Sequence, residues 1–280
     1  MSRIPFAITA AVVLAGAALS QPMSARRIAW NKPFPPFHLA GPIYYVGSAG
    51  LGCYLIHTQA GDILLDAGLP EMARQVEANI AKLGFRVTDV RILLNTHAHF
   101  DHAGGLAALK EKSGAKLYAS QGDAALLRAG TVFPAVKVDH LLRDGEQVRL
   151  GGVTITAHLT PGHTPGCTTW TMPITDGGRT LNVLFFCSIS VSDNRLVGHP
   201  TYPGILADYE RSFALLKTLP CDIFLAPHTE FFDMKEKVAR MKPGAPNPFI
   251  EPGEFQRFLA GAQRDFEQRL AQQNAKSARR

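Results

Sequence analysis

One short segment constrains this 280-residue chain more than any other: Thr-His97-Ala-His99-Phe-Asp101-His102. It follows the apolar run 90–94 directly and places three imidazoles and a carboxylate within six positions. Zinc prefers imidazole and carboxylate ligands, and it binds both in their deprotonated form. His97 and His99 project from the same side of an extended chain and can bind one ion. Asp101 and His102 follow at a loop and helix start, where they can reach a second ion.

Two further histidines, each placed just after an expected strand, are candidates for the remaining ligands. His163 lies in the tight turn Pro-Gly-His-Thr-Pro-Gly, and His228 follows the apolar run 223–226. Paired hydrolytic metals stand about 3.5–4 Å apart, and each catalytic zinc keeps a position for water beside its protein ligands. We therefore expect one ion bound by His97, His99 and His163, and a second bound by Asp101, His102 and His228.

Short apolar runs alternate with helical patterns from residue 43 to the end of the chain. Strands are expected over 43–46, 53–57, 63–65, 90–94, 116–119, 153–158, 168–172, 181–186 and 223–226. Helices are expected over 70–83, 105–112, 123–129, 209–219 and 254–270. No linker, repeat or low-complexity block interrupts this order, which predicts one α/β domain with helices outside the strands.

Composition and charge exclude several classes of protein. With 46% hydrophobic and 19% charged residues, the chain is neither disordered nor collagen-like. The net charge of +6 suits anionic partners. However, no basic module interleaved with aromatic residues is present, so no nucleic-acid partner is expected. Part of the surplus lies in the tail 264–280, which holds five basic and two acidic residues.

Residues 1–20 have the pattern of a secretory signal peptide. Arg3 precedes a long uncharged apolar run that ends in small residues, which fits cleavage before Gln21, and a second cut after Ala25 also fits. A membrane span needs about 20 apolar residues, more than this run supplies. We therefore expect an exported, periplasmic protein without a stable membrane anchor after cleavage, whose single domain covers 21–280.

The motifs resemble those of the metallo-β-lactamase superfamily, whose signature is His-X-His-X-Asp-His. The resemblance runs from Trp30 to the final helix. Leu-Leu-Asp-Ala-Gly at 64–68, the turn around His163 and the late Pro-His228 look like the third subclass of true metallo-β-lactamases. The resemblance implies an αββα sandwich, in which two mixed β-sheets pack face to face with helices outside. It also implies two zinc ions at one edge of the sheets.

One position separates members of this superfamily. In many of its hydrolases, including glyoxalase II and lactonases, the strand after the Pro-Gly-His turn ends in an Asp that bridges both metals. Other lactamase subclasses have a Cys ligand there. Here the strand reads Phe186-Cys187-Ser188-Ile-Ser190. Side chains alternate along a strand and His102 already completes the second ligand set, so we expect Ser188 to face the metals instead of Cys187. In the resembled subclass such serines hold the substrate carboxylate, which implies that Ser188 and Ser190 bind substrate.

The resemblance implies zinc-dependent hydrolysis of the β-lactam amide bond by a metal-bound hydroxide, which confers resistance to these antibiotics. Asp101 would be the catalytic residue that orients the hydroxide, and the partner would be a small-molecule β-lactam. The alternative is a secreted metallohydrolase of the same fold that acts on a lactone or thioester, against which the missing bridging Asp argues. A nucleic-acid-processing member and a non-catalytic zinc scaffold are more distant alternatives. The nearby aromatic residues Trp30, Phe34, Phe37 and Phe133 are either walls of the cleft or ordinary core residues.

The four cysteines leave the disulfide pattern open. Cys167 and Cys187 lie on the two arms of a hairpin expected around residues 177–178, at equal distances from its turn, and a bridge between them is a hypothesis. The resembled subclass often joins a Cys seven residues before the last His ligand to the C-terminal helix. Cys221 occupies that position, but no cysteine follows it, so this bridge cannot form.

Overall fold

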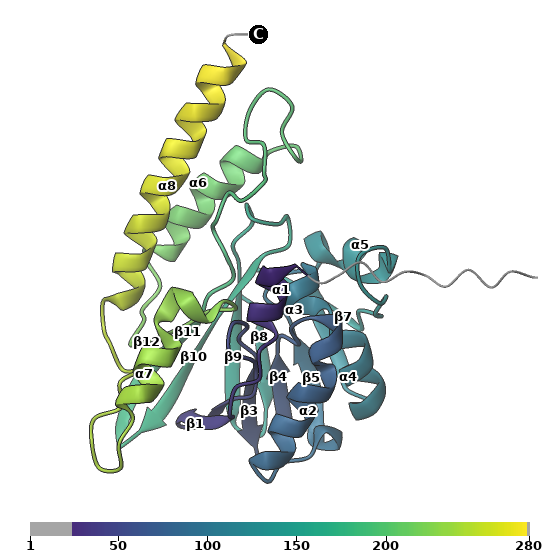
Figure 1. Cartoon of the computed structure of the whole chain (residues 1–280), viewed down its shortest axis with the longest axis vertical. Coiled ribbons are helices and arrows are strands. Elements are labelled where there is room, and N and C mark those ends of the chain that lie inside the picture. The colour runs from purple at the N-terminus through teal and green to yellow at the C-terminus, as the bar shows by residue number, and fades with distance from the viewer. Residues whose placement is uncertain (1–23, 279–280) are drawn as a thin grey trace, which may run out of the picture.

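The computed structural model describes residues 24–278 and consists of two β-sheets packed face to face with helices on their outer sides (Figure 1). Both sheets are mixed, and the predicted αββα sandwich is confirmed. The seven strands of the first sheet are, in spatial order, β1 (Phe37–Ala40), β2 (Ile43–Tyr45), β3 (Tyr54–Thr58), β4 (Gly61–Leu65), β5 (Val90–Leu94), β6 (Lys116–Ser120) and β7 (His140–Leu142). The five strands of the second sheet are β12 (Ile223–Leu225), β11 (Arg179–Phe185), β10 (Thr168–Asp176), β9 (Val153–Leu159) and β8 (Gln147–Leu150).

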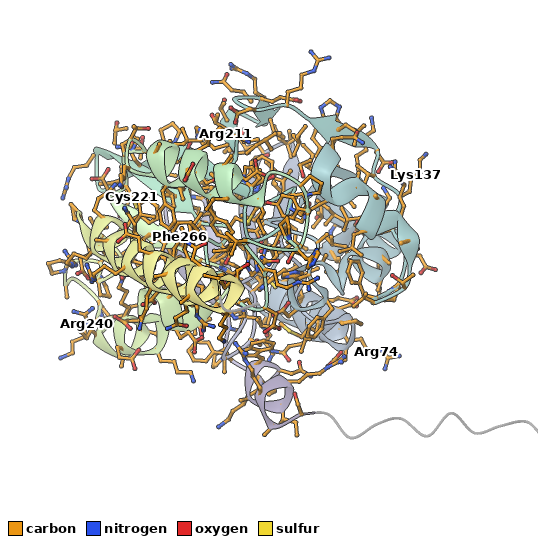
Figure 2. The ribbon with its side chains drawn as sticks, turned by 90° about the horizontal axis from the view of Figure 1, so that it is seen from above. Arg74, Lys137, Arg211, Cys221, Arg240 and Phe266 are labelled. Carbon is orange, nitrogen blue, oxygen red and sulfur yellow. A yellow bond between two sulfur atoms is a disulfide. The ribbon has the colours of Figure 1, made fainter. Side chains whose placement is uncertain are left out.

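Helices cover the outer face of each sheet. The first sheet is covered by α2 (Ala73–Lys82), α4 (Leu106–Ser113) and α5 (Gln121–Ala129), and the second by α6 (Ile205–Leu216) and the long α8 (Glu254–Ser277). Phe266 of α8 packs on Tyr209 and Phe213 of α6 and lies between the two helices (Figure 2). Three shorter α-helices are also present within residues 24–278, namely α1 (Ala25–Trp30), α3 (Phe100–Ala103) and α7 (Met234–Arg240), together with 3₁₀ helices over Pro70–Met72, Val87–Asp89 and Thr229–Phe232.

Alternation along the strands sorts side chains into two hydrophobic layers. In β4, Ile63 and Leu65 belong to the layer between the sheets, whereas Leu64 belongs to the layer under α2 and α4. Leu94 and Leu93 of β5 divide in the same way. This is the two-residue period of a strand that is buried on both faces. Burying one Leu or Ile side chain completely stabilises the folded state by about 1.5–3 kcal/mol. The two layers therefore hold the strand ends in place.

The predicted elements are present, but some ends differ by four to seven residues: α6 begins at Ile205 instead of 209, β10 ends at Asp176 instead of 172, and α8 ends at Ser277 instead of 270. The predicted hairpin turns at Gly177–Gly178, where both residues have positive φ (56° and 76°) and Asp176 pairs with Arg179. Two-residue turns of this kind match the twist of paired strands. The elements β1, β7, β8, α1, α3 and α7 were not predicted from the sequence.

Two predictions concern the chain as a whole. The leader at 1–20 lies outside the described residues. None of the helices within 24–278 has the length and apolar character needed to cross a bilayer. The labelled basic residues Arg74, Lys137, Arg211 and Arg240 project outward at widely separated places (Figure 2).

Candidate metal centre

The six predicted ligands lie at one edge of the sandwich because the strands that carry them end there. His97 and His99 follow β5, while Asp101 and His102 lie on α3, which begins at Phe100. In the second sheet β9, β11 and β12 run parallel to one another, since β10 is antiparallel to both β9 and β11. The turn after β9 and the segment after β12 therefore leave that sheet at the same end, and they bring His163 and His228 to the site.

His97, His99 and His163 form the first cluster. One ring nitrogen from each lies within 4.8 Å of the others, and Nδ1 of His99 is 3.1 Å from Nε2 of His163. The buried Nε2 of His97 has no hydrogen-bond partner among the described residues. A buried nitrogen left without a partner costs about 1–3 kcal/mol, which a bound metal would remove.

Hydrogen bonds behind the rings set the direction of two lone pairs. The Nδ1 of His163 donates to the carbonyl oxygen of Ser190 at 2.9 Å, which leaves its Nε2 free for a metal. The Nδ1 of His97 lies 3.1 Å from the Thr96 hydroxyl, which itself donates to Asp66 at 2.8 Å. The network therefore assigns the proton of His97 to Nδ1 and directs the Nε2 lone pair into the cluster.

Asp101, His102 and His228 form the second cluster. The Oδ2 of Asp101 lies 3.5 Å from Nε2 of His102 and 3.6 Å from Nε2 of His228. These separations are long for hydrogen bonds, but they match the distance of about 3.4 Å between two ligands of a tetrahedral zinc with bonds near 2.1 Å. The rings of His97 and His102 stand 4.4 Å apart, so the two clusters are adjacent. Both clusters fit metal ions in donor type, spacing and burial.

Burial keeps the five histidines neutral, which is the form that binds metal. It lowers the pKa of His163 to about 4 and that of His228 to about 3. The pKa of His99 is lowered, and those of His97 and His102 are lowered well below 6.5, again mainly because burial disfavours the charged ring. Neighbouring imidazoles add to the effect, because two cations at this distance repel each other.

A pH dependence of the metal-free protein follows from these shifts. Unfolded histidines take up protons near pH 6.5, whereas the folded ones resist protonation down to about pH 4 at His163 and about pH 3 at His228. Above pH 6.5 neither state binds these protons, so the histidines do not favour unfolding. As the pH falls below 6.5, only the unfolded chain takes up the protons, and the free energy of unfolding decreases. Burial raises the pKa of Asp66 to about 8 and that of Asp123 to about 6, which opposes the trend, but the histidines outnumber these carboxyls.

We therefore expect the free energy of unfolding of the metal-free protein to fall between pH 6.5 and pH 4. Denaturant titrations of chelator-treated protein at several pH values measure this directly. A free energy that stays constant or rises as the pH is lowered would contradict the expected burial of neutral imidazoles.

Asp66 supports the first cluster through Thr96, a contact that was not predicted from the sequence. Its carboxylate accepts the Thr96 amide N–H at 2.7 Å as well as the hydroxyl, and it is fully buried. Its φ of 61° is in the left-handed region, which a residue other than glycine adopts at a cost. The signal was present in the Leu-Leu-Asp-Ala-Gly motif, but nothing in the sequence linked that motif to His97.

The hypothesised disulfide between Cys167 and Cys187 is confirmed. The hairpin pairs Trp170 with Phe185, and extending this register puts Thr168 opposite Cys187, so the predicted symmetric placement is off by one position. The bridge forms nonetheless, because the paired ladder ends at Phe185 and the chain beyond it leaves the regular strand. The Sγ of Cys187 lies 3.6 Å from Nδ1 of His97, so the bridge contacts the back of the first cluster.

The metal clusters open into a cleft of about 1680 Å³. Ser188 and Ser190 both line it, with their hydroxyl oxygens 3.3 Å apart, while Cys187 is turned away into the disulfide. The expectation that Ser188 and not Cys187 faces the cleft therefore agrees with the geometry. The other wall belongs to α8, through residues that include Phe258 and Phe266.

Of the four aromatic candidates for the cleft wall, only Trp30 lines it. Its ring packs against His228 with centroids 5.0 Å apart and the two ring planes tilted by 45°. Phe34 and Phe37 pack against the layer between the sheets, and Phe133 is buried in the layer under the helices, so these three are core residues. Helix α1, which carries Trp30, was missed because its contacts are remote in sequence. The Trp30 carbonyl accepts the Ser48 hydroxyl at 2.5 Å.

The fold and this site define a metal-dependent hydrolase. A family model described as the metallo-beta-lactamase superfamily matches residues 53–228, and the chain belongs to that superfamily. This confirms the resemblance and makes the chain an enzyme whose fold implies bound metal ions, typically zinc.

Comparisons with individual proteins agree with this assignment. The chain is similar to the crystal structure of BJP-1, a subclass B3 metallo-beta-lactamase of Bradyrhizobium japonicum, with 48% identity and a TM-score of 0.86 over 89% of this chain and 98% of that one. It is also similar to the native FEZ-1 metallo-beta-lactamase from Legionella gormanii, with 40% identity and a TM-score of 0.85 over 91% and 99%. A hydroxyacylglutathione hydrolase of Rhodopseudomonas palustris is 32% identical over 111 residues, which span 40% of this chain and only 39% of that relative.

Proposed function

We propose that this enzyme hydrolyses the amide bond of β-lactams with two zinc ions, one at each cluster, and so confers resistance to these antibiotics. The observation that carries the proposal is a complete set of six ligands beside Ser188, at the strand end where related lactone and thioester hydrolases have a bridging Asp. The nearly full-length similarity to two metallo-beta-lactamases supports it. The match to hydroxyacylglutathione hydrolases covers a smaller part of the chain and favours the alternative less.

The side chains divide the chemistry among them. Zinc, when bound, lowers the pKa of water to about 7 and so supplies a hydroxide nucleophile at neutral pH. The neutral imidazoles of both clusters would hold the ions without adding positive charge. Asp101, a member of the second cluster, contributes the single carboxylate among the six candidate ligands, and it could accept a hydrogen bond from the nucleophile and orient it toward the carbonyl carbon.

Ser188 and Ser190 are placed to bind the carboxylate that β-lactams carry beside the scissile amide. Ser190 is anchored, since its carbonyl accepts the Nδ1–H of His163, and its Oγ lies 3.2 Å from the same nitrogen. A carboxylate that accepts both hydroxyl protons would lie next to the first cluster. Substrate position is thereby coupled to a metal ligand.

Substrate turnover tests the proposal directly. We expect the purified, zinc-loaded protein to hydrolyse nitrocefin, a penicillin and a carbapenem, and to lose this activity when a chelator removes the metal. Acyl-homoserine lactone and S-lactoylglutathione, measured in parallel, represent the lactone and thioester alternative. Turnover of either one with no β-lactam hydrolysis would overturn the proposal, and no hydrolysis of any of these by zinc-loaded protein would favour a non-catalytic scaffold.

The serine assignment makes a separate prediction. Replacing Ser188 by alanine removes one hydrogen bond to a charged group, worth about 1.5–3 kcal/mol, so KM for carboxylate-bearing β-lactams should rise about 10- to 100-fold. The value of kcat should change little, because the ligands stay in place. Gln272→Ala, in the same cleft but on α8, is the matched control and should leave KM unchanged. An unaltered KM in Ser188→Ala would remove the serine from the substrate site.

We also propose that the protein is exported to the periplasm, with a β-lactam as its partner and neither nucleic acid nor a stable membrane anchor. The disulfide supports export, since such bonds persist in oxidising compartments. Cleavage before Gln21 would retain Ser24, whose side chain accepts the Arg27 amide N–H and caps α1. A cut after Ala25 would remove this cap. N-terminal sequencing of the protein from a periplasmic fraction distinguishes these outcomes.

A further inference from the structure

The amino end of α5 lies directly behind the three-histidine cluster. Asp123, in the first turn of this helix, is 2% exposed, and its Oδ2 accepts the amide N–H of Ala98 at 2.8 Å. Ala98 is the residue between His97 and His99. One carboxylate oxygen therefore holds the backbone of the segment that presents two of the three ligands.

The same helix end also contacts the turn that carries His163. The hydroxyl of Ser120 donates to the carbonyl of Gly166 at 2.7 Å and accepts the amide N–H of Asp123 at 3.4 Å. Hydrogen bonding from the backbone of Gly166 opposes the rise in the pKa of Asp123 that burial causes, so the turn acts on its carboxylate as well. Asp123 is thus connected to the ligand segments on both sides.

The fit between α5 and this turn leaves no room for adjustment. A Cβ added to Gly166 would stand 2.3 Å from the Asp123 nitrogen and 2.4 Å from its carboxyl carbon. A Cβ added to Gly122, on the helix, would stand 2.4 Å from the carbonyl oxygen of Pro165. Real Cβ atoms essentially never approach so closely, so glycine at both positions is required for the helix end to reach the turn.

The cluster needs such a connection because its ligands come from different sheets. His97 and His99 follow β5 of the first sheet, and His163 follows β9 of the second. Small relative movement of the sheets would separate the ligand atoms. A buried carboxylate is costly unless hydrogen bonds compensate it, and here the compensating donors belong to the ligand-bearing segments themselves.

We propose that Asp123 is a positioning residue for the metal ion of the three-histidine cluster, which holds the His97–His99 segment and the His163 turn at a fixed distance. This inference rests on metal binding at that cluster and is independent of whether β-lactams are the substrate. It uses no part of the second cluster, so its effect should be confined to one metal.

Metal affinity is the measurement that tests it. Zinc is titrated into metal-free protein against a chromophoric chelator, and retained metal is counted after dialysis. Asp123→Ala should weaken binding at one site by about 10- to 100-fold, the usual effect of removing a residue that orients a ligand. Asp123→Asn keeps an acceptor for the Ala98 amide but turns an NH₂ group toward Gly166, so its loss should be intermediate. Gly166→Ala, which displaces the helix end and leaves the carboxylate intact, should also weaken that site.

Two comparisons separate positioning from a general loss of stability. Asp222 accepts the amide N–H and the side-chain N–H of Asn182, at 2.7 and 2.9 Å, at the end of β12 away from His228. Asp222→Ala therefore loses a comparable carboxylate contact and should retain full metal affinity. Combining Asp123→Ala with His163→Ala should cost less than the sum of the two separate losses, because one of the two segments that Asp123 holds together then carries no ligand.

The outcomes are distinct. Native zinc affinity in Asp123→Ala overturns the proposal, as does a loss equal to that of Asp222→Ala or one fully additive with His163→Ala. If Asp123→Ala does not fold, Asp123→Asn and Gly166→Ala decide in the same way. Absence of zinc binding in the unmodified protein would instead refute the metal centre itself.

Discussion

Asp101→Asn is expected to reduce β-lactam hydrolysis on the order of 10²- to 10⁴-fold and to remove the metal of the second cluster. Asparagine has nearly the same shape but loses the negative charge that binds a cation and accepts the hydrogen bond of the nucleophile. Because Asp101 faces His102 and His228 at 3.5 and 3.6 Å, the remaining two imidazoles would hold that ion weakly. The first cluster should keep its zinc, so metal content should fall from two ions to one per chain.

The matched control is Asp193→Asn, which makes the same substitution on an exposed residue of the same cleft. It should retain its metal and most of its activity. Steady-state rates with nitrocefin and metal analysis after dialysis measure both variants. Full turnover by Asp101→Asn would contradict the catalytic role, and two retained ions would contradict its role as a ligand.

Removing the disulfide by the double replacement of Cys167 and Cys187 with serine is expected to lower the free energy of unfolding by about 3 kcal/mol. The bridge joins residues 20 apart in sequence, and closing a loop of this size restricts the unfolded chain by roughly that amount. Both sulfurs are buried, so the two serine hydroxyls that replace them would be buried polar groups, which adds a desolvation cost.

Cys221→Ser is the control, since Cys221 is a partly buried free thiol. Cys221→Ser should lower the free energy of unfolding by less than the double replacement does. The difference between Cys221→Ser and the unmodified protein should be the same with and without reductant. For the unmodified protein, a reductant present during denaturation should reproduce the loss seen in the double variant. Equal stability of the unmodified protein and the double variant would show that the bridge does not stabilise the fold.

The two clusters of candidate ligands were predictable because their signal is local. The two-residue spacing of His97 and His99 after an apolar strand determines the direction of their side chains. The choice of Ser188 over Cys187 came from the number of ligands already present, together with the resemblance. The same style of argument misplaced the cysteine register by one position, because it assumed a regular ladder up to Cys187 where the strand ends at Phe185.

The contacts behind the ligands were not predictable. Asp123 is part of a Ser-X-X-Asp pattern, which is typical of a helix start and gives no hint that its carboxylate bonds to Ala98. Phe133 lies close to the motifs in the chain but in the core of the molecule, whereas Trp30, at the far end of the sequence, contacts His228. Distance along the chain carries little information about such neighbours.

Side-chain spacing and hydrophobic period, which are properties of neighbouring residues, determined the kinds of candidate ligand and a single α/β domain with helices outside the strands, while the resemblance of the motifs implied the αββα class. Only the tertiary structure decided which buried groups support the ligands, which aromatic residue reaches the cleft, and how His163 is held beside His97. These contacts join segments from different sheets. They arise from how the layers pack, which no local pattern records.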